Sequence, residues 1–185
     1  MKKIIILMFV SLIMSINVMA QTSDSREQFQ TYSEGAQSGD TKSMYQLAYL
    51  YYTGKGVTKD YKLAYEWFMK AADKGNSNSM FYLGEMFNYG RHVSKDYKLA
   101  AEWYDKGASM GNAYCMRQLG ELYYYGRGVS QNYDKAKEWY EKAAEKGNST
   151  AMTDLGYCYE YGKGVAEDIQ KAREWYEKLP KATMD

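Results

Sequence analysis

This chain of 185 residues contains very little histidine, cysteine or proline. It has one histidine, His92, two cysteines, Cys115 and Cys158, and one proline, Pro180. A Ser/His/Asp triad would have to use His92, which is expected in a surface loop. A zinc site would combine that histidine with two separated cysteines, without metal-ligand spacing. We therefore expect no catalytic triad, no metal site and no cofactor, and two cysteines are too few for a disulfide framework.

The scarcity of proline favours helix, because proline removes a backbone donor and breaks helices. The charge is balanced, with 24 basic and 23 acidic residues. Basic and acidic side chains are interspersed along the predicted helices, whereas nucleic-acid binding normally needs a clustered basic face. Nucleic acid is therefore not an expected partner.

Motifs of phosphate chemistry are also missing. The segment GYCYEYGKG (156–164) superficially resembles a phosphate loop, but its spacing is wrong by one residue and no Ser or Thr follows the lysine. One carboxylate recurs beside Trp in every repeat described below, which is typical of a solvated helix face: Glu66, Glu102, Glu138 and Glu174. The sequence therefore predicts that the protein is not an enzyme.

The first segment, MKKIIILMFVSLIMSINVMA (1–20), has the pattern of a secretory signal peptide. Lys2 and Lys3 precede a short apolar run that ends at Ala20. The alternative is an uncleaved membrane anchor, for which the run is only just long enough and is diluted by polar residues. We expect cleavage after Ala20, a mature chain of residues 21–185 without a stable membrane span, and a periplasmic or secreted location.

The dominant pattern is a repeat with a period of 36 residues, which is typical of a solenoid. Four residue types recur at this step: Trp67, Trp103, Trp139 and Trp175; Ala64, Ala100, Ala136 and Ala172; Met44, Met80, Met116 and Met152; Gly75, Gly111 and Gly147. We predict an all-α fold, a right-handed α/α solenoid of four 36-residue helix-pair repeats preceded by a half repeat. The expected repeats are 41–76, 77–112, 113–148 and 149–180, with a leading helix over about 25–38 and nine helices in all.

Each period contains two helical stripes. Met44, Leu47 and Ala48 begin the first, at i, i+3 and i+4. A polar residue that can cap the second helix precedes it in every repeat: Asp60, Asp96, Asn132 and Asp168. His92 replaces a loop glycine, so if the position requires a positive φ, that loop is mildly strained or has a different turn.

Repetition of these stripes has a structural purpose, because one helix pair is too small to bury its own apolar face. Stacking equivalent pairs turns each exposed face into an interface. We expect Trp and Tyr side chains to fill the gaps between closely approaching helices, and replacing a Trp by alanine to cost about 3–5 kcal/mol if it is buried.

The segment 113–148 resembles the Sel1-like repeat family, relatives of tetratricopeptide repeats. The resemblance rests on residues that the other units largely share: Leu119-Gly120, Tyr123, Gly126, Gly128-Val129, Ala136, Trp139-Tyr140, Ala143-Ala144 and Gly147-Asn148. It covers about residues 26–180 and implies a binding scaffold, although one repeat fold hosts many partners.

The cysteine-rich branch of that family pairs a cysteine near the end of one unit with a cysteine that opens the next. Cys115 fits the second position, but Gly107 stands where its partner would be, and Cys158 aligns with core positions. Both cysteines are therefore expected to be free thiols. Some members of that branch are described as binding or hydrolysing β-lactams, but the Ser-x-x-Lys and Lys-Thr-Gly motifs of β-lactamases are missing here.

The first helix of each repeat is expected to line a concave groove. Positions off its core stripe differ between repeats while core positions stay nearly fixed, as binding of one asymmetric partner would require. The alternative is that exposed positions simply drift. The predicted partner-binding residues are Tyr45, Tyr49, Tyr52, Phe81, Glu85, Asn88, Arg117, Glu121, Tyr124, Thr153, Tyr157 and Glu160.

A protein or peptide is the expected ligand of this groove, since tyrosine suits protein contacts and the acidic centre favours basic groups. The alternative is a glycan or cell-wall fragment, whose sugar rings could stack on the tyrosines. The shortened last repeat offers a second surface, formed by Trp175, Tyr176 and Leu179. That end could contact a partner or a second copy of the chain.

Overall fold

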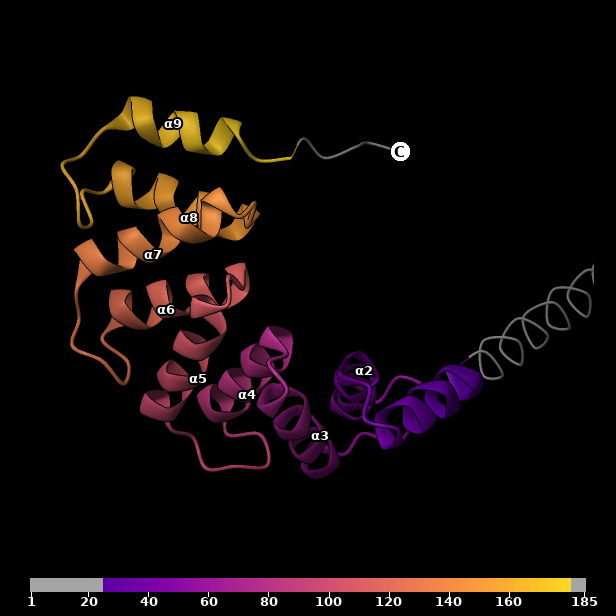
Figure 1. The fold of residues 1–185 in the computed structure, drawn as a ribbon. Coiled ribbons are helices and arrows are strands. Elements are labelled where there is room, and N and C mark those ends of the chain that lie inside the picture. Colours follow the sequence, from indigo (N-terminus) through magenta and orange to yellow (C-terminus); the bar gives the residue numbers. More distant parts are fainter. Residues whose placement is uncertain (1–24, 181–185) are drawn as a thin grey trace, which may run out of the picture. The chain divides into compact units, whose positions relative to one another are not determined.

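The computed structural model describes residues 25–180. These residues form nine helices and no strand, which confirms the all-α prediction (Figure 1). The first covers residues 25–37. It is followed by α2 (Thr41–Thr53), α3 (Tyr61–Asp73), α4 (Ser77–Tyr89), α5 (Tyr97–Ser109), α6 (Ala113–Tyr125), α7 (Tyr133–Glu145), α8 (Ser149–Glu160) and α9 (Ile169–Glu177).

No helix in the described range is both long and apolar enough to cross a membrane. The predicted signal peptide, residues 1–20, lies outside the described residues.

The helices begin at polar caps. The predicted cap Asp96 accepts hydrogen bonds from the backbone N–H of Lys98 and Leu99, at 2.9 and 3.0 Å. Asn132 and Asp168 act in the same way at α7 and α9. Each cap satisfies backbone donors that the first helical turn leaves free. The short polar residues therefore fix where each second helix starts.

The loop between the two helices of a repeat requires a left-handed backbone. His92 has φ 67°, close to the 72°, 70° and 70° of its equivalents Gly56, Gly128 and Gly164. Glycine adopts this conformation without the steric cost that a Cβ imposes. The position does require a positive φ, so the loop of the second repeat carries the predicted strain.

The chain divides into two compact units, with the boundary at Ala71 and Ala72 near the end of α3. In the first unit, the leading helix packs on α2, with the ring centroids of Phe29 and Tyr51 5.8 Å apart. Ala48 and Phe68 are both fully buried there. This unit therefore has its own small core.

In the second unit, consecutive helices from α4 to α9 pack against one another (Figure 1). Tyr104 on α5 is fully buried, and its ring lies directly against Gly84 on α4. Tyr140 packs on Gly120 in the same way, one repeat later. The glycine of each Leu-Gly pair therefore leaves room for a tyrosine ring of the next helix.

The tryptophans are partly buried, and Trp67, Trp139 and Trp175 pack against the core. The residue after the Trp is fully or almost fully buried in three repeats: Phe68, Tyr104 and Tyr140. A lysine three residues further on lies over each indole, 3.7–4.2 Å from the ring centroid: Lys70 over Trp67, Lys106 over Trp103, Lys142 over Trp139 and Lys178 over Trp175. Each indole is therefore covered on one face by the ammonium group of a lysine on the same helix or at its end.

Both cysteines are buried free thiols, as predicted. Burial raises the pKa of Cys115, and it raises the pKa of Cys158 to about 12. A Cβ atom placed on Gly107 would touch the Cys115 sulfur. The position that the family resemblance indicates for a partner cysteine is therefore adjacent, and glycine there leaves the thiol unpaired.

Candidate functional site

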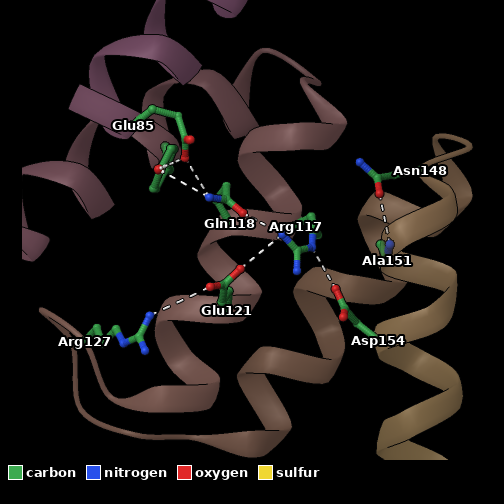
Figure 2. Close-up of polar contacts among 9 residues, drawn as sticks. Glu85, Arg117, Gln118, Glu121, Arg127, Asn148, Ala151 and Asp154 are labelled. Carbon is green, nitrogen blue, oxygen red and sulfur yellow. Dashed lines mark hydrogen bonds and ion pairs between the residues drawn. The ribbon is translucent and has the colours of Figure 1, made fainter. Parts of the chain in front are cut away.

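Three first helices of the second unit, α4, α6 and α8, share a network of polar side chains (Figure 2). Arg117 on α6 donates from Nε to Asp154 Oδ2 on α8 (2.8 Å) and from Nη1 to the side chain of Gln118 (2.9 Å). Gln118 donates to Glu85 Oε1 on α4 (2.8 Å), which also accepts from the Tyr104 hydroxyl (2.6 Å). The network therefore ties together three consecutive repeats.

Glu121 extends this network along α6. Its carboxylate lies 3.1 Å from Arg117 Nη1 and 3.8 Å from Arg127 Nη1. The side chains of Arg117 and Glu121 are each 25% exposed. Ion pairs this close to solvent contribute little stability, but they fix the guanidinium and carboxylate in place on an accessible face.

Glu85 is a largely enclosed carboxylate of this network. Burial raises its pKa above the ordinary value of 4.5, and hydrogen bonds from Tyr104 and Gln118 oppose that shift. Burial is also the main cause that raises the pKa of Tyr104, and the negative charge of Glu85 raises it further. The folded chain therefore holds a proton on Glu85 more readily than the unfolded chain does.

We expect Glu85→Gln to change how stability depends on pH. Because the pKa of Glu85 is raised on folding, the native chain takes up a proton in the window just above pH 4.5 and loses stability as pH rises through it. Glutamine can still accept both hydrogen bonds and removes the titrating group. The variant should gain stability relative to the native chain between pH 4 and pH 7, measured by urea unfolding. Parallel stability curves across that range would contradict this.

An aromatic hollow adjoins the network. It has a volume of about 260 Å³ and is lined by Tyr124, Tyr125, Tyr140, Asp154 and Tyr157. Tyr125 and Tyr157 are 55% and 43% exposed. The Tyr124 ring meets both edge-on, with centroids 4.9 and 6.3 Å away. The hollow therefore combines accessible ring surface with the carboxylate that Arg117 holds.

Several of the predicted partner-binding residues lie on this face, and one of them is buried. Glu85, Arg117 and Glu121 belong to the network, and Tyr124 and Tyr157 line the hollow. Asn88 is only 7% exposed, so its prediction as a partner-binding residue is wrong. A side chain shorter than the Tyr and Glu at equivalent positions does not reach solvent from there.

The remaining predicted residues of this unit belong neither to the polar network nor to the lining of the aromatic hollow. Phe81 packs against Tyr104 and Tyr114, with ring centroids 6.2 and 5.7 Å away. Thr153 is exposed, and its hydroxyl donates to the Ser149 carbonyl at 3.2 Å. Glu160 accepts a hydrogen bond from the Tyr176 hydroxyl at 2.8 Å.

In the first unit, two of the three predicted tyrosines pack against a buried phenylalanine. Tyr45 and Tyr52 lie 6.2 and 6.0 Å from Phe68 by ring centroid, and Tyr49 stacks on Tyr45 at 6.3 Å. All three tyrosines are partly buried. They therefore contribute to packing as well as to the surface.

The predicted second surface, at the last helix, is partly covered. Trp175 lies beneath Lys178, and Tyr176 packs on Gly156. Leu179 is partly buried just after α9. A second hollow of about 190 Å³ remains there, lined by Glu160, Ile169, Ala172, Arg173 and Tyr176.

Sequence reasoning missed several residues of this region. Gln118 and Asp154 are equivalent residues of consecutive repeats, and the residue type at this position varies between repeats. Variation between repeats was the criterion for the groove residues, so it could have identified both. Tyr89, Tyr125 and Tyr161 recur at the 36-residue step and are 52%, 55% and 53% exposed. Their recurrence was visible but indicated only a loop. Among the described residues, no cluster of His, Cys, Asp and Glu could hold a metal ion.

The comparisons with known proteins agree with this architecture. The Sel1 repeat model matches residues 41–76, 77–112, 113–148 and 149–179. A Sel1 repeat protein from Oxalobacter formigenes is 32% identical, with a TM-score of 0.79 over 83% of this chain and 62% of that one. A protective antigen of uropathogenic Escherichia coli with an SLR fold is also 32% identical, with a TM-score of 0.75 over 80% of this chain and 32% of that one.

This chain thus spans about a third of the Escherichia coli antigen and less than two thirds of the Oxalobacter protein. Cysteine rich protein B of Helicobacter pylori, 23% identical with a TM-score of 0.56 over 70% of this chain and 93% of that one, shares the fold. Comparison with curated proteins finds no match. Four consecutive repeat matches and these neighbours confirm the predicted solenoid, and the chain belongs to the Sel1 repeat family, whose members commonly act as protein–protein interaction scaffolds.

Proposed function

We propose that this protein is a non-enzymatic adaptor of the bacterial envelope or secreted fraction. It binds a protein or peptide on the face formed by α4, α6 and α8. The location rests on the signal-peptide pattern of residues 1–20. Proteins of this family are generally non-enzymatic scaffolds, which agrees with the missing catalytic motifs.

The aromatic hollow is the observation that carries the proposal. Exposed Tyr125 and Tyr157 provide large amphipathic rings that lose little rotamer freedom on binding. Asp154 and Arg117 are held in one geometry by their 2.8 Å ion pair. A face that is already ordered loses less entropy when a partner binds. The hollow therefore has the composition of a protein-binding hot spot.

A glycan is the second candidate ligand, and the exposed rings of Tyr157 and Tyr161 favour it. Their centroids lie 4.4 Å apart with 37° between the planes, so the two rings support each other and leave an outer ring face. That face could stack against a sugar ring of a cell-wall fragment.

Capture of partners from envelope and culture extracts tests the proposal. The full chain serves as bait beside a Tyr125→Ala/Tyr157→Ala variant. The matched control is Leu99→Ala/Met110→Ala, which removes two apolar side chains that are 37% and 52% exposed away from the hollow. We expect the native chain and the control to retain a protein that the tyrosine variant does not retain. Circular dichroism checks that all three baits are folded.

Two outcomes would contradict a protein-binding face at the hollow. Retention of the same proteins by all three baits would place binding elsewhere, with the end around Trp175 as the next surface to test. If no bait retains a protein, titration with cell-wall fragments becomes decisive. Binding that depends on Tyr157 would then establish the glycan function instead.

A further inference from the structure

The last tyrosine of each first helix in the second unit shows a periodic relation to a basic residue. Tyr89 is covered by Arg91, whose Cζ lies 5.1 Å from the ring centroid. Tyr125 is covered by Arg127 in the same way, at 4.7 Å. Both arginines follow their tyrosine by two residues, in the loop that ends the helix. In two consecutive repeats, a guanidinium from the chain itself therefore occupies this ring face.

The fourth repeat breaks this relation. Its equivalent tyrosine is Tyr161, and the equivalent basic residue is Lys163. The Lys163 ammonium instead lies 5.3 Å from the ring of Tyr133. Among residues 25–180, no basic side chain covers Tyr161, which is 53% exposed. In the last repeat, the Tyr161 ring therefore lacks the cation that covers Tyr89 and Tyr125 in the two preceding repeats.

The Tyr157 ring lies against that of Tyr161. Tyr157 is one turn earlier, on α8, is 43% exposed, and places its ring centroid 4.4 Å from that of Tyr161, with 37° between the planes. At this separation each ring covers one face of the other, so the outer ring face remains for a cation, which its negative charge attracts.

Two carboxylates flank the tyrosine pair on the same helix. Asp154 and Glu160 lie three residues before and three residues after Tyr157, but Asp154 lines the aromatic hollow with Tyr157, whereas Glu160 lines the second hollow with Tyr176. Asp154 uses Oδ2 to accept from Arg117. Within the described chain, Glu160 has a hydrogen bond from Tyr176 and no salt bridge. The carboxylate of Glu160 and the ring of Tyr161 therefore lie close together, and neither is paired with a cation of the described residues.

We propose that Tyr157, Glu160 and Tyr161, the α8 cation site, bind an arginine side chain of the partner protein. This deepens the proposed function and depends on it. The planar guanidinium stacks on tyrosine and pairs with carboxylate in one geometry, which an ammonium does less well. The intramolecular Tyr89–Arg91 and Tyr125–Arg127 contacts show the same chemistry within this chain. A neutral sugar would use the rings but leave Glu160 without a counter-charge.

N-acetyl-L-arginine amide is the probe, and N-acetyl-L-citrulline amide is its neutral isostere. The full chain carries ¹³C-labelled tyrosine, and NMR follows the ring resonances during titration into the millimolar range. We expect saturable shifts of the Tyr157 and Tyr161 resonances, with an affinity for the arginine compound at least about 5-fold above that for citrulline. Raising the salt from about 50 to 300 mM should weaken this binding several-fold, because the site is exposed.

Variants locate the binding. Tyr161→Ala should abolish the shift of Tyr157, and Glu160→Gln should weaken binding several-fold while keeping an acceptor for Tyr176. Tyr89→Ala is the matched control, because it removes the same repeat position where the chain supplies its own arginine. It should leave the affinity unchanged.

Equal shifts with arginine and citrulline compounds, or unchanged affinity in Tyr161→Ala, would overturn this inference. Tyrosine shifts produced by a neutral chitin trisaccharide alone would also overturn it. If the capture experiment yields a protein that depends on Tyr125 and Tyr157 while the arginine compound causes no shift, the proposed function stands and this site assignment fails.

Discussion

Replacing Tyr104 by alanine is expected to lower the free energy of unfolding by about 3–5 kcal/mol. The side chain is fully buried, and its ring fills the space above Gly84. Removing it leaves a large cavity between α4 and α5. It also deprives Glu85 of the 2.6 Å hydrogen bond from the Tyr104 hydroxyl. Urea unfolding followed by circular dichroism measures the loss.

Two variants separate the ring from its surroundings. Tyr104→Phe keeps the ring and removes only the hydroxyl, as in the first repeat where Phe68 is native, and should cost about 1 kcal/mol. Trp103→Ala removes a larger side chain that is only partly buried, and should cost clearly less than Tyr104→Ala. A larger loss for Trp103→Ala would make the tryptophan the main interface residue and contradict the packing described above.

Replacing Gly128 by alanine is expected to cost about 2–5 kcal/mol, for two independent reasons. Its φ of 70° places any Cβ in the left-handed region, at about 1–2 kcal/mol. That Cβ would also lie against the backbone of Tyr97 and within 2.6 Å of the Lys98 nitrogen, and overpacking of this kind costs about 1–3 kcal/mol. Backbone at the start of α5 cannot move aside as the end of a long side chain can. Thermal and urea unfolding both test this.

Gly147→Ala is the matched control, because it shares the backbone conformation without the crowding. Its φ is 84°, and a Cβ there would meet no atom within 4 Å. It should therefore show only the conformational cost of about 1–2 kcal/mol. Equal losses for the two variants would mean that the contact with Tyr97 adds nothing.

The repeat architecture could be predicted because it is a local and periodic property. Each cap, such as Asp96 or Asn132, acts on backbone groups within three residues of itself, so the sequence contains all of its partners. Comparison with the equivalent loop glycines Gly128 and Gly164 showed that His92 stands at an unusual position, and the structure established that its φ is positive there too. Periodicity likewise showed which residues of a helix share a face.

The candidate site could be predicted only in part, because its partners come from other repeats. Periodicity placed Arg117 on the accessible face but did not show that it pairs with Asp154, 37 residues away, or that Gln118 joins it to Glu85. It also placed Asn88 on that face, although the structure buries it.

By itself, the sequence determined the number of repeats, their two helices and their caps. The tertiary structure alone decided that Tyr104 is fully buried while Trp103 is only partly buried, that the loop at His92 has a positive φ, and that Tyr161 lacks the cation its equivalents carry. The physical reason is distance along the chain. Propensity and capping act over a few residues, whereas burial and ion pairing depend on where the neighbouring repeat's side chains come to rest.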